Sequence, residues 1–382
     1  MTHPEIFLTY FNAHLEEMLA DLKTLVELES PSHESKEASD KAGQFIRKLF
    51  AGIGFRVRTI RQETCGDHVI AETGDPSEPG ILFLGHYDTV FPLGTIRSMP
   101  FRIDREAGKV FGPGVLDMKG GIIMGYCVMK CLKELGRMPE KHVTFFFSSD
   151  EESGSFHSSD LIVEEAKKNR RVIVLEPGLD GIGSFKAKRY GRGTYTVTAH
   201  GRAAHSGGNP EQAISPLLEI ARQLEKIDTW NEYEKGITFA PTCMGGGVPG
   251  TCMVPEKAWF TMDVRFRTSE MAEETDRRIR SLQPLKEGLT LEITGGIDKP
   301  PMETPPELIS AVSKIGKEIG LEMQPFSIGG GSDGNFTSGT AHVDTLDGVG
   351  MTGLFLHNPG EYANIRHIPQ RCALLARLVE EL

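Results

Sequence analysis

Histidine and acidic residues gather in short clusters along the chain, most of them directly after a run of apolar residues. Three clusters are GHYDTVFP (85–92), GVLDMKGG (114–121) and SSDEESGS (148–155). VLEPG (174–178) adds one carboxylate, and FLHNPGEY (355–362) adds one histidine. These residue types are ligands for divalent zinc, and two such ions about 4 Å apart can activate water for hydrolysis. The clusters therefore indicate the ligand set of a two-metal hydrolase.

Simpler interpretations exist for each cluster taken alone. Asp88 beside His86 can be a helix cap next to an ordinary surface histidine, and Asp117 can be an N-cap in its glycine-rich loop. The acidic run 150–152 can be a solvated stretch of charge. It follows HVTFFFSS, however, which is expected to be a buried strand. Adjacent carboxylates near a sheet core repel one another and need cations, which favours the metal interpretation.

Predicted strands and helices alternate over the first half of the chain. Apolar spacing predicts helices over 7–28, 36–50 and 119–135. Short apolar or alternating runs predict strands over 55–61, 68–72, 81–85, 142–147 and 171–175. This order predicts an α/β fold with a doubly wound, mainly parallel sheet.

Ligands of such sheets bind beyond the carboxyl ends of the strands. The histidine and acidic residues that follow the predicted strands are His86, Asp88, Asp150, Glu151, Glu152 and Glu176. We therefore expect these side chains to form one site at one edge of the sheet.

The pattern changes near Tyr190. Alternation predicts strands over 193–198, 257–267 and 289–294, and helical spacing predicts helices over 212–227 and 269–282. This order suggests an inserted α+β two-layer sandwich over residues 189–298, serving as a lid and dimerisation domain. The proline-rich segment 299–307 is the expected return linker. The catalytic domain is then discontinuous, formed by residues 1–188 and 299–382.

Composition excludes several classes of function. A chain of 382 residues with 39% hydrophobic and 25% charged residues is typical of a globular protein with two domains. The net charge of −11 argues against a nucleic-acid partner. No apolar stretch is long enough to span a membrane, and no signal peptide is recognisable. The six cysteines form no Cys-x-x-Cys pair and are expected to be buried, reduced thiols, which favours a cytoplasmic location.

The motifs together resemble a di-zinc glutamate carboxypeptidase of the carboxypeptidase G type. Its wider superfamily contains aminoacylases, succinyl-diaminopimelate desuccinylase and acetylornithine deacetylase. The resemblance covers nearly the whole chain and is carried by GHYDTVFPLGT, FGPGVLDMKGG, SSDEESGS, EPG, GRAAHSGGNPE, MDVR, GGGSDGN and HNPGEY.

The resemblance implies two divalent metal ions, with zinc expected. Asp117 would be the bridging ligand. His86 and Glu176 would hold one ion, and Glu152 and His357 would hold the other.

Three catalytic residues are also implied. Asp88 would orient the ring of His86. Glu151 would be the general base that activates a metal-bridging water and passes its proton to the leaving amine. His205, in the inserted domain, would stabilise the oxyanion, in several relatives across a dimer interface. A homodimer through the inserted domain is therefore expected, although a purely structural loop histidine is the alternative for His205.

Substrate recognition is where the chain departs from the resemblance. Arg265 would bind the terminal carboxylate of the substrate, with a plain surface charge as the alternative. Gly330 lies in a glycine stretch without the Lys and Ser/Thr of a phosphate loop and is expected to line the substrate pocket. Lys299 stands where close relatives carry arginine, and Cys252 where the family usually has asparagine. Both changes concern the substrate and leave the metal ligands intact.

These inferences predict a zinc-dependent hydrolase that cleaves an amide bond next to a C-terminal carboxylate. The leading hypothesis is a glutamate carboxypeptidase-like exopeptidase acting on a small peptide or an N-acyl amino acid. An N-acyl amino acid deacylase or a dipeptidase with the same site is the near alternative. The alternative from a different class of function is an inactive peptide-binding homologue, and the presence of Glu151 and all five ligands argues against it.

Overall fold

The computed structural model describes residues 3–382, which form two compact units. The first unit comprises the chain up to Lys188, with Met302–Ser327 and Ser332–Leu382. The second comprises Arg189–Pro301 and Ile328–Gly331. Lys299 and Gly330 thus belong to the second unit.

A six-stranded sheet forms the centre of the first unit. Its strands, in spatial order, are β1 (Arg56–Ile60), β2 (His68–Thr73), β6 (Val143–Ser148), β3 (Gly80–His86), β7 (Asn169–Val174) and β17 (Asp344–Leu346). The pairs β6–β3, β3–β7 and β7–β17 are parallel, and the pairs β1–β2 and β2–β6 are antiparallel. The predicted α/β class with a mainly parallel sheet is confirmed.

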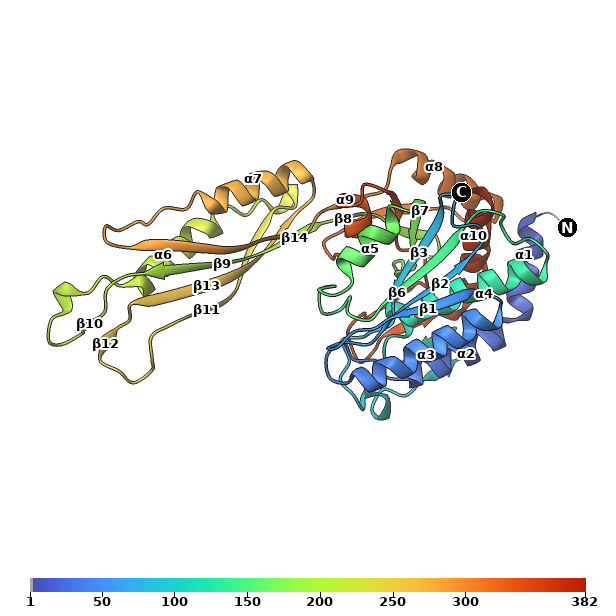
Figure 1. The fold of residues 1–382 in the computed structure, drawn as a ribbon, viewed down its shortest axis with the longest axis horizontal. Coiled ribbons are helices and arrows are strands. Elements are labelled where there is room, and N and C mark those ends of the chain that lie inside the picture. Colours follow the sequence, from blue (N-terminus) through green and yellow to red (C-terminus); the bar gives the residue numbers. More distant parts are fainter. Residues whose placement is uncertain (1–2) are drawn as a thin grey trace. The chain divides into compact units, whose positions relative to one another are not determined.

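Both faces of this sheet are covered by helices (Figure 1). The helices of the first unit are α1 (His3–Ala13), α2 (Leu15–Glu27), α3 (Lys36–Gly52), α4 (Gly120–Glu134), α5 (Ser159–Ala166), α8 (Pro306–Glu318), α9 (Gly334–Gly339) and α10 (Ile368–Glu381). In β6, Phe145 and Phe147 pack in the core with α3 and α4, whereas Phe146 packs on the other face with α5 and α9. Successive strand residues point to opposite faces, which explains why these strands are continuously apolar.

Two smaller sheets complete the first unit. One contains β15 (Met302–Glu303), β8 (Ser184–Arg189) and β16 (Gln324–Ile328). The other contains β18 (Gly353–Leu354), β19 (Tyr362–Asn364), β5 (Lys109–Phe111) and β4 (Arg102–Asp104).

The second unit is an antiparallel sheet with two helices. Its strands, in order, are β11 (Thr238–Gly246), β13 (Lys257–Phe266), β9 (Gly191–His200) and β14 (Thr290–Lys299). Burial alternates along β13, and its inward side chains pack against α6 (Pro216–Asp228) and α7 (Ser269–Arg280). A two-stranded ribbon joins β10 (Ala204–His205) to β12 (Met253–Val254). The predicted two-layer α+β architecture is confirmed.

The structure differs from the sequence-based predictions in several details. The helix expected over 7–28 is two helices, because the backbone leaves the helical conformation at His14. Strand β11 has no counterpart among the predicted strands, since it is an edge strand that contains a proline and two glycines. Cys243 and Cys252 are exposed, whereas the other four cysteines are buried as expected. No helix within residues 3–382 has the length and apolar character needed to cross a membrane.

Candidate active site

Three neighbouring parallel strands deliver most of the candidate side chains. His86 is the last residue of β3, and Glu176 follows the end of β7 by two residues. Glu151 and Glu152 lie in the loop after β6, which pairs with β3. The carboxyl ends of these strands meet at one edge, so residues remote in sequence come together there, as expected.

Asp117 lies in an irregular loop before α4. Val115–Lys119 is an irregular turn in which Asp117 and Met118 have non-helical backbone angles, and the peptide bond after Asp117 is cis. Gly114 opens the turn with φ of 70°, a left-handed conformation that favours glycine. A Cβ atom there would lie 2.5 Å from Cγ2 of Thr89. Glycine is therefore required at this position on two grounds.

His357 comes from the loop between β18 and β19, far along the chain. Its φ is 61°, and that of Phe355 in the same loop is 66°. Left-handed conformations of non-glycine residues are uncommon and persist where surrounding contacts fix them.

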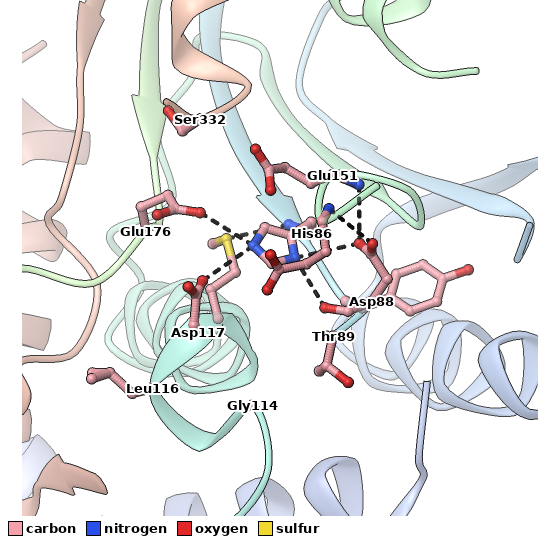
Figure 2. Close-up of polar contacts among 12 residues, drawn as sticks. His86, Asp88, Thr89, Gly114, Leu116, Asp117, Glu151, Glu176 and Ser332 are labelled. Carbon is pink, nitrogen blue, oxygen red and sulfur yellow. Dashed lines mark hydrogen bonds and ion pairs between the residues drawn. The ribbon is translucent and has the colours of Figure 1, made fainter. Parts of the chain in front are cut away.

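The carboxylate of Asp117 lies between the two histidines. Oδ1 is 3.2 Å from Nε2 of His86, and Oδ2 is 3.2 Å from Nε2 of His357. Oε1 of Glu176 is also 3.2 Å from Nε2 of His86, and Oε1 of Glu152 is 3.2 Å from Nε2 of His357. Figure 2 shows His86 in contact with Asp117 and Glu176. The five side chains form two groups that share Asp117.

These atoms suit divalent cations. Neighbouring ligand atoms in a tetrahedral zinc site with bonds of about 2.0–2.2 Å lie about 3.3–3.6 Å apart, close to the observed spacing. Oε1 of Glu152 is buried, and the polar neighbour recorded for it is Nε2 of His357, at 3.2 Å. Such an atom is costly unless a cation binds it. Single atoms of His86, Asp117 and Glu152 all lie within 4.8 Å of one another, which makes them a candidate metal site.

Without metal, the cluster holds protons. Burial, and then the charge of Asp117, raises the pKa of Glu152 to about 8. Hydrogen bonds to Asp117 and Glu152 raise the pKa of His357 to about 11. Burial opposes protonation of His86, but the surrounding carboxylates, Asp117 foremost, raise its pKa well above the usual value. A metal ion must displace these protons, so metal affinity is expected to fall in acid.

Asp88 contacts both the ring of His86 and the loop that contains Glu151 and Glu152. The ring Nδ1 is 3.1 Å from the backbone oxygen of Asp88 and 3.4 Å from its carboxylate. The carboxylate also accepts hydrogen bonds from Oγ of Ser32 and from the backbone N–H groups of Glu151 and Glu152. Asp88 thus fixes the loop that carries the proposed base and one proposed ligand.

Two further residues of the site had no role in the sequence-based prediction. Lys186 is buried, and its Nζ lies 3.5 Å from Oε2 of Glu176. It sits in an alternating basic segment that gives no sign of this contact. Glu361 is buried against the backbone of the Asp117 loop, and burial raises its pKa to about 7. Its place in HNPGEY, four residues after His357, was an available signal.

His205 lies in the second unit, in the two-residue strand β10, and is exposed. Its Nδ1 accepts hydrogen bonds from the N–H groups of Gly207 (3.1 Å) and Gly208 (3.0 Å). A ring nitrogen that accepts carries no proton, so Nε2 carries the proton of the neutral ring. The loop therefore presents His205 as a hydrogen-bond donor.

The proposed substrate residues differ in their surroundings. Arg265 makes two hydrogen bonds to Asp263, and its Nη1 donates to the backbone oxygen of Gly329. Gly330 is exposed, and no atom lies within 4 Å of where its Cβ would be. Lys299 is only 5% exposed at the end of β14, and its role in substrate recognition stays a prediction. Cys252 is exposed, and its backbone oxygen accepts hydrogen bonds from Ser206.

Comparison with known proteins places the chain in a family. The model of peptidase family M20/M25/M40 matches residues 82–381, which include all the candidate ligands. The chain belongs to this family. It is therefore a hydrolase of the M20 peptidase family, and the site above is its candidate metal site.

Relatives in this family differ in substrate. Carboxypeptidase G2 of Pseudomonas sp. (strain RS-16) is 27% identical over 97% of this chain and 91% of its own length. Succinyl-diaminopimelate desuccinylase of Acinetobacter baumannii (strain ACICU) is 26% identical over 88% of this chain and 92% of its own length.

Solved structures share the fold. Aminopeptidase PepT from Bacillus cereus ATCC 10987 superposes with a TM-score of 0.79 at 19% identity, covering 96% of this chain and 98% of PepT. The YXEP protein of Bacillus subtilis, described as a dinuclear metal-binding peptidase of the M20 family, gives 0.73 at 15% identity, covering 97% and 98%.

Proposed function

We propose that this protein is a zinc-dependent exopeptidase that cleaves an amide bond next to a C-terminal carboxylate. The observation that carries the proposal is the Asp117 carboxylate, with one oxygen towards His86 and the other towards His357. His86, Asp117 and Glu176 would hold one ion, and Asp117, Glu152 and His357 the other. When bound, the two ions supply Lewis acidity and a nucleophile usable at neutral pH.

Glu151 is the proposed general base. Its backbone N–H donates a hydrogen bond to Asp88 (Figure 2), and it directly precedes Glu152 in the sequence. In this role its carboxylate takes a proton from the attacking water and delivers it to the departing amine nitrogen. Neutral His205, with its proton on Nε2, has the polarity needed to donate a hydrogen bond to an oxyanion. Arg265, partly neutralised by Asp263, is the proposed partner of the terminal carboxylate.

A cavity of about 330 Å³ adjoins Glu152 and bears on the substrate. This volume is within the range of small-ligand sites, about 300–1,000 Å³. Its apolar wall includes Pro31, Val90, Phe91 and Pro92, and its acidic members are Glu34 and Glu152. None of the described residues that line it is lysine or arginine. The apolar wall suits a neutral, apolar acyl group, whereas an anionic acyl group would lie near the carboxylate of Glu34.

The cavity favours a carboxypeptidase-like substrate over a succinylated one. The test compares N-benzoyl-, N-acetyl- and N-succinyl-glutamate, in which only the acyl group changes. We expect kcat/KM to be at least about ten-fold lower for the succinyl compound than for the benzoyl compound. Val90→Lys places a positive charge in the cavity lining and should reduce the ratio of kcat/KM for the benzoyl compound to kcat/KM for the succinyl compound. Leu93→Lys is the control, because Leu93 is exposed in the same loop but lies outside the cavity lining, and it should leave this ratio unchanged. Faster hydrolysis of the succinyl compound by the wild type would favour a deacylase.

The proposed base has its own test. Glu151→Gln should lower kcat by about 10²–10⁴-fold while the protein still binds about two metal ions. Glu164→Gln, on the exposed face of α5, is the matched control and should keep full activity. Substantial turnover by Glu151→Gln would remove this residue from the mechanism.

Assembly and location complete the proposal. We infer a homodimer through residues 189–298, and light scattering of the purified protein tests it directly. A cytoplasmic location is proposed because all six cysteines are unpaired. Fractionation of cells expressing the protein from its own gene would check this.

A further inference from the structure

Glu361 is a buried carboxylate with no assigned part in the chemistry. Its exposure is 0%. It is the last residue of the loop between β18 and β19, which also carries His357. Burial of a carboxylate is costly unless its surroundings compensate, so its contacts should reveal its role.

The hydrogen bonds recorded for this side chain all come from the backbone of the Asp117 loop, and buried Lys119 adds an electrostatic interaction. Oε1 accepts hydrogen bonds from the N–H groups of Leu116 (2.7 Å) and Asp117 (3.0 Å). Oε2 accepts one from the N–H of Gly114 (3.2 Å). One side chain thus satisfies three donors in a loop too irregular to satisfy them itself.

The strand pairing explains why Glu361 reaches this loop. β5 and β19 are antiparallel neighbours, and Phe111 pairs with Tyr362. The Asp117 loop begins directly after Phe111, and Glu361 directly precedes Tyr362. The two loops therefore leave adjacent strands at the same place, and Glu361 joins them at their base.

A direct catalytic role does not fit these contacts. Both oxygens of Glu361 already accept hydrogen bonds from backbone groups, and no hydrogen bond or ion pair recorded for it reaches either histidine of the site. The side chain that does face the histidines is Asp117, and its backbone N–H is one of the three donors. Any shift of that N–H moves the carboxylate on which both ligand groups depend.

We propose that Glu361 is a positioning residue that sets metal affinity by fixing the Asp117 loop against the His357 loop. The inference rests on the proposed two-metal site and adds a residue outside the ligand set. Loss of supporting contacts around metal ligands typically costs about 10–100-fold in affinity. Because Asp117 belongs to both ligand groups, the loss should affect both ions.

The test compares Glu361→Gln with Glu219→Gln. Glu219 is also 0% exposed and also accepts a backbone N–H, from Leu285, but it lies in the second unit. Zinc affinity of the metal-free proteins is measured by competition with a chromophoric chelator, and folding is checked by circular dichroism. Glu361→Gln should bind both ions about ten-fold or more weakly, and Glu219→Gln should match the wild type.

Several outcomes separate the possibilities. If the wild type binds no zinc, the proposed function fails. If the wild type binds two ions and folded Glu361→Gln binds them equally well, the positioning role alone is overturned. If Glu361→Gln does not fold, Glu361→Asp decides: its shorter side chain cannot reach all three donors, and unchanged zinc affinity in it would overturn the inference.

Discussion

At the residue scale, the site depends on carboxylates that each serve more than one partner. Asp117 faces two histidines with its two oxygens. Asp88 lies against the ring of His86 and binds the backbone of both Glu151 and Glu152. Because each carboxylate contacts several groups, the position of each group depends on that of the others. Single substitutions should therefore have effects beyond the side chain removed.

Substitution of Asp88 should reveal this coupling. In Asp88→Asn an amide NH₂ replaces one carboxylate oxygen. If it replaces Oδ2, Ser32 and the N–H of Glu152 lose their acceptor, and if it replaces Oδ1, the N–H of Glu151 loses its acceptor. We expect zinc affinity to fall about 10–100-fold by isothermal titration calorimetry. Asp75→Asn is the control, because exposed Asp75 also accepts a backbone N–H, from Ser77. Equal zinc affinities for the two variants would contradict the prediction.

His68 links stability to pH. It is fully buried, its Nδ1 is 3.1 Å from Oγ of Ser149, and burial lowers its pKa. The unfolded histidine takes up a proton near pH 6.5, before the folded one does. Its contribution to stability is therefore present above pH 6.5 and is lost as the pH falls, by at most about 1.4 kcal/mol per unit.

The measurement is urea unfolding of wild type and His68→Gln at pH 7.5 and 5.5. The free energy of unfolding should fall more steeply towards acid in the wild type, because glutamine does not titrate. Taking the difference between the two proteins removes the contribution of the other titrating groups. Parallel pH dependences would show that His68 does not titrate differently in the folded and unfolded states.

At the scale of elements, strand ends and two irregular loops build the site. Strands β3, β6 and β7 bring their side chains to one edge by sheet geometry alone. The loops with Asp117 and His357 have no such regularity, and they depend on left-handed residues and on Glu361. These loops should therefore be the places where small backbone changes most affect metal binding.

Gly114→Ala tests the first loop. Alanine at φ of 70° is strained, and its Cβ would lie 2.5 Å from Thr89. We expect a loss of about 1–3 kcal/mol in unfolding free energy together with weaker zinc binding. Gly136→Ala is matched, since its φ is 66° but no atom lies within 4 Å of the new Cβ. Unchanged zinc affinity in Gly114→Ala would mean that the loop adapts.

At the scale of the whole molecule, all five proposed ligands belong to the first unit. The second unit has its own apolar core, formed by the sheet, α6 and α7. Both tryptophans, Trp230 and Trp259, belong to the second unit, so tryptophan fluorescence reports on it alone.

Zinc should therefore stabilise the two units unequally. A ligand stabilises the part that binds it, by about 2.7 kcal/mol at a hundred-fold excess over its Kd. Chelation should lower the thermal transition seen by far-ultraviolet circular dichroism, and the tryptophan transition should move less. An equal shift of both signals would show that the units unfold as one.

The sequence alone predicted much of the secondary structure of this protein and the edge of the sheet at which the site lies. Continuous apolar runs predicted which strands are buried on both faces, because the polarity of successive side chains is read directly from the sequence. Strand ends also predicted that His86 and Glu176 would lie close together, because parallel strands end at the same edge of a sheet. The ligand roles themselves were predicted from the resemblance of the motifs to a known family. The sequence did not predict the break in the helix at His14 or the edge strand β11, because neither has a distinctive local pattern.

Only the tertiary structure decided how the side chains share their partners. Gly114 and Glu361 are 247 residues apart, and no period or propensity reports a hydrogen bond across that separation. The contact between Lys186 and Glu176 was not predicted either, because nothing in the sequence distinguishes Lys186 from the other basic residues of its segment. The burial of Lys299, whose predicted role in substrate binding stays a prediction, likewise comes from the tertiary structure. Sequence sets which residue types stand at strand ends, whereas the distances between loops arise from packing of the whole unit.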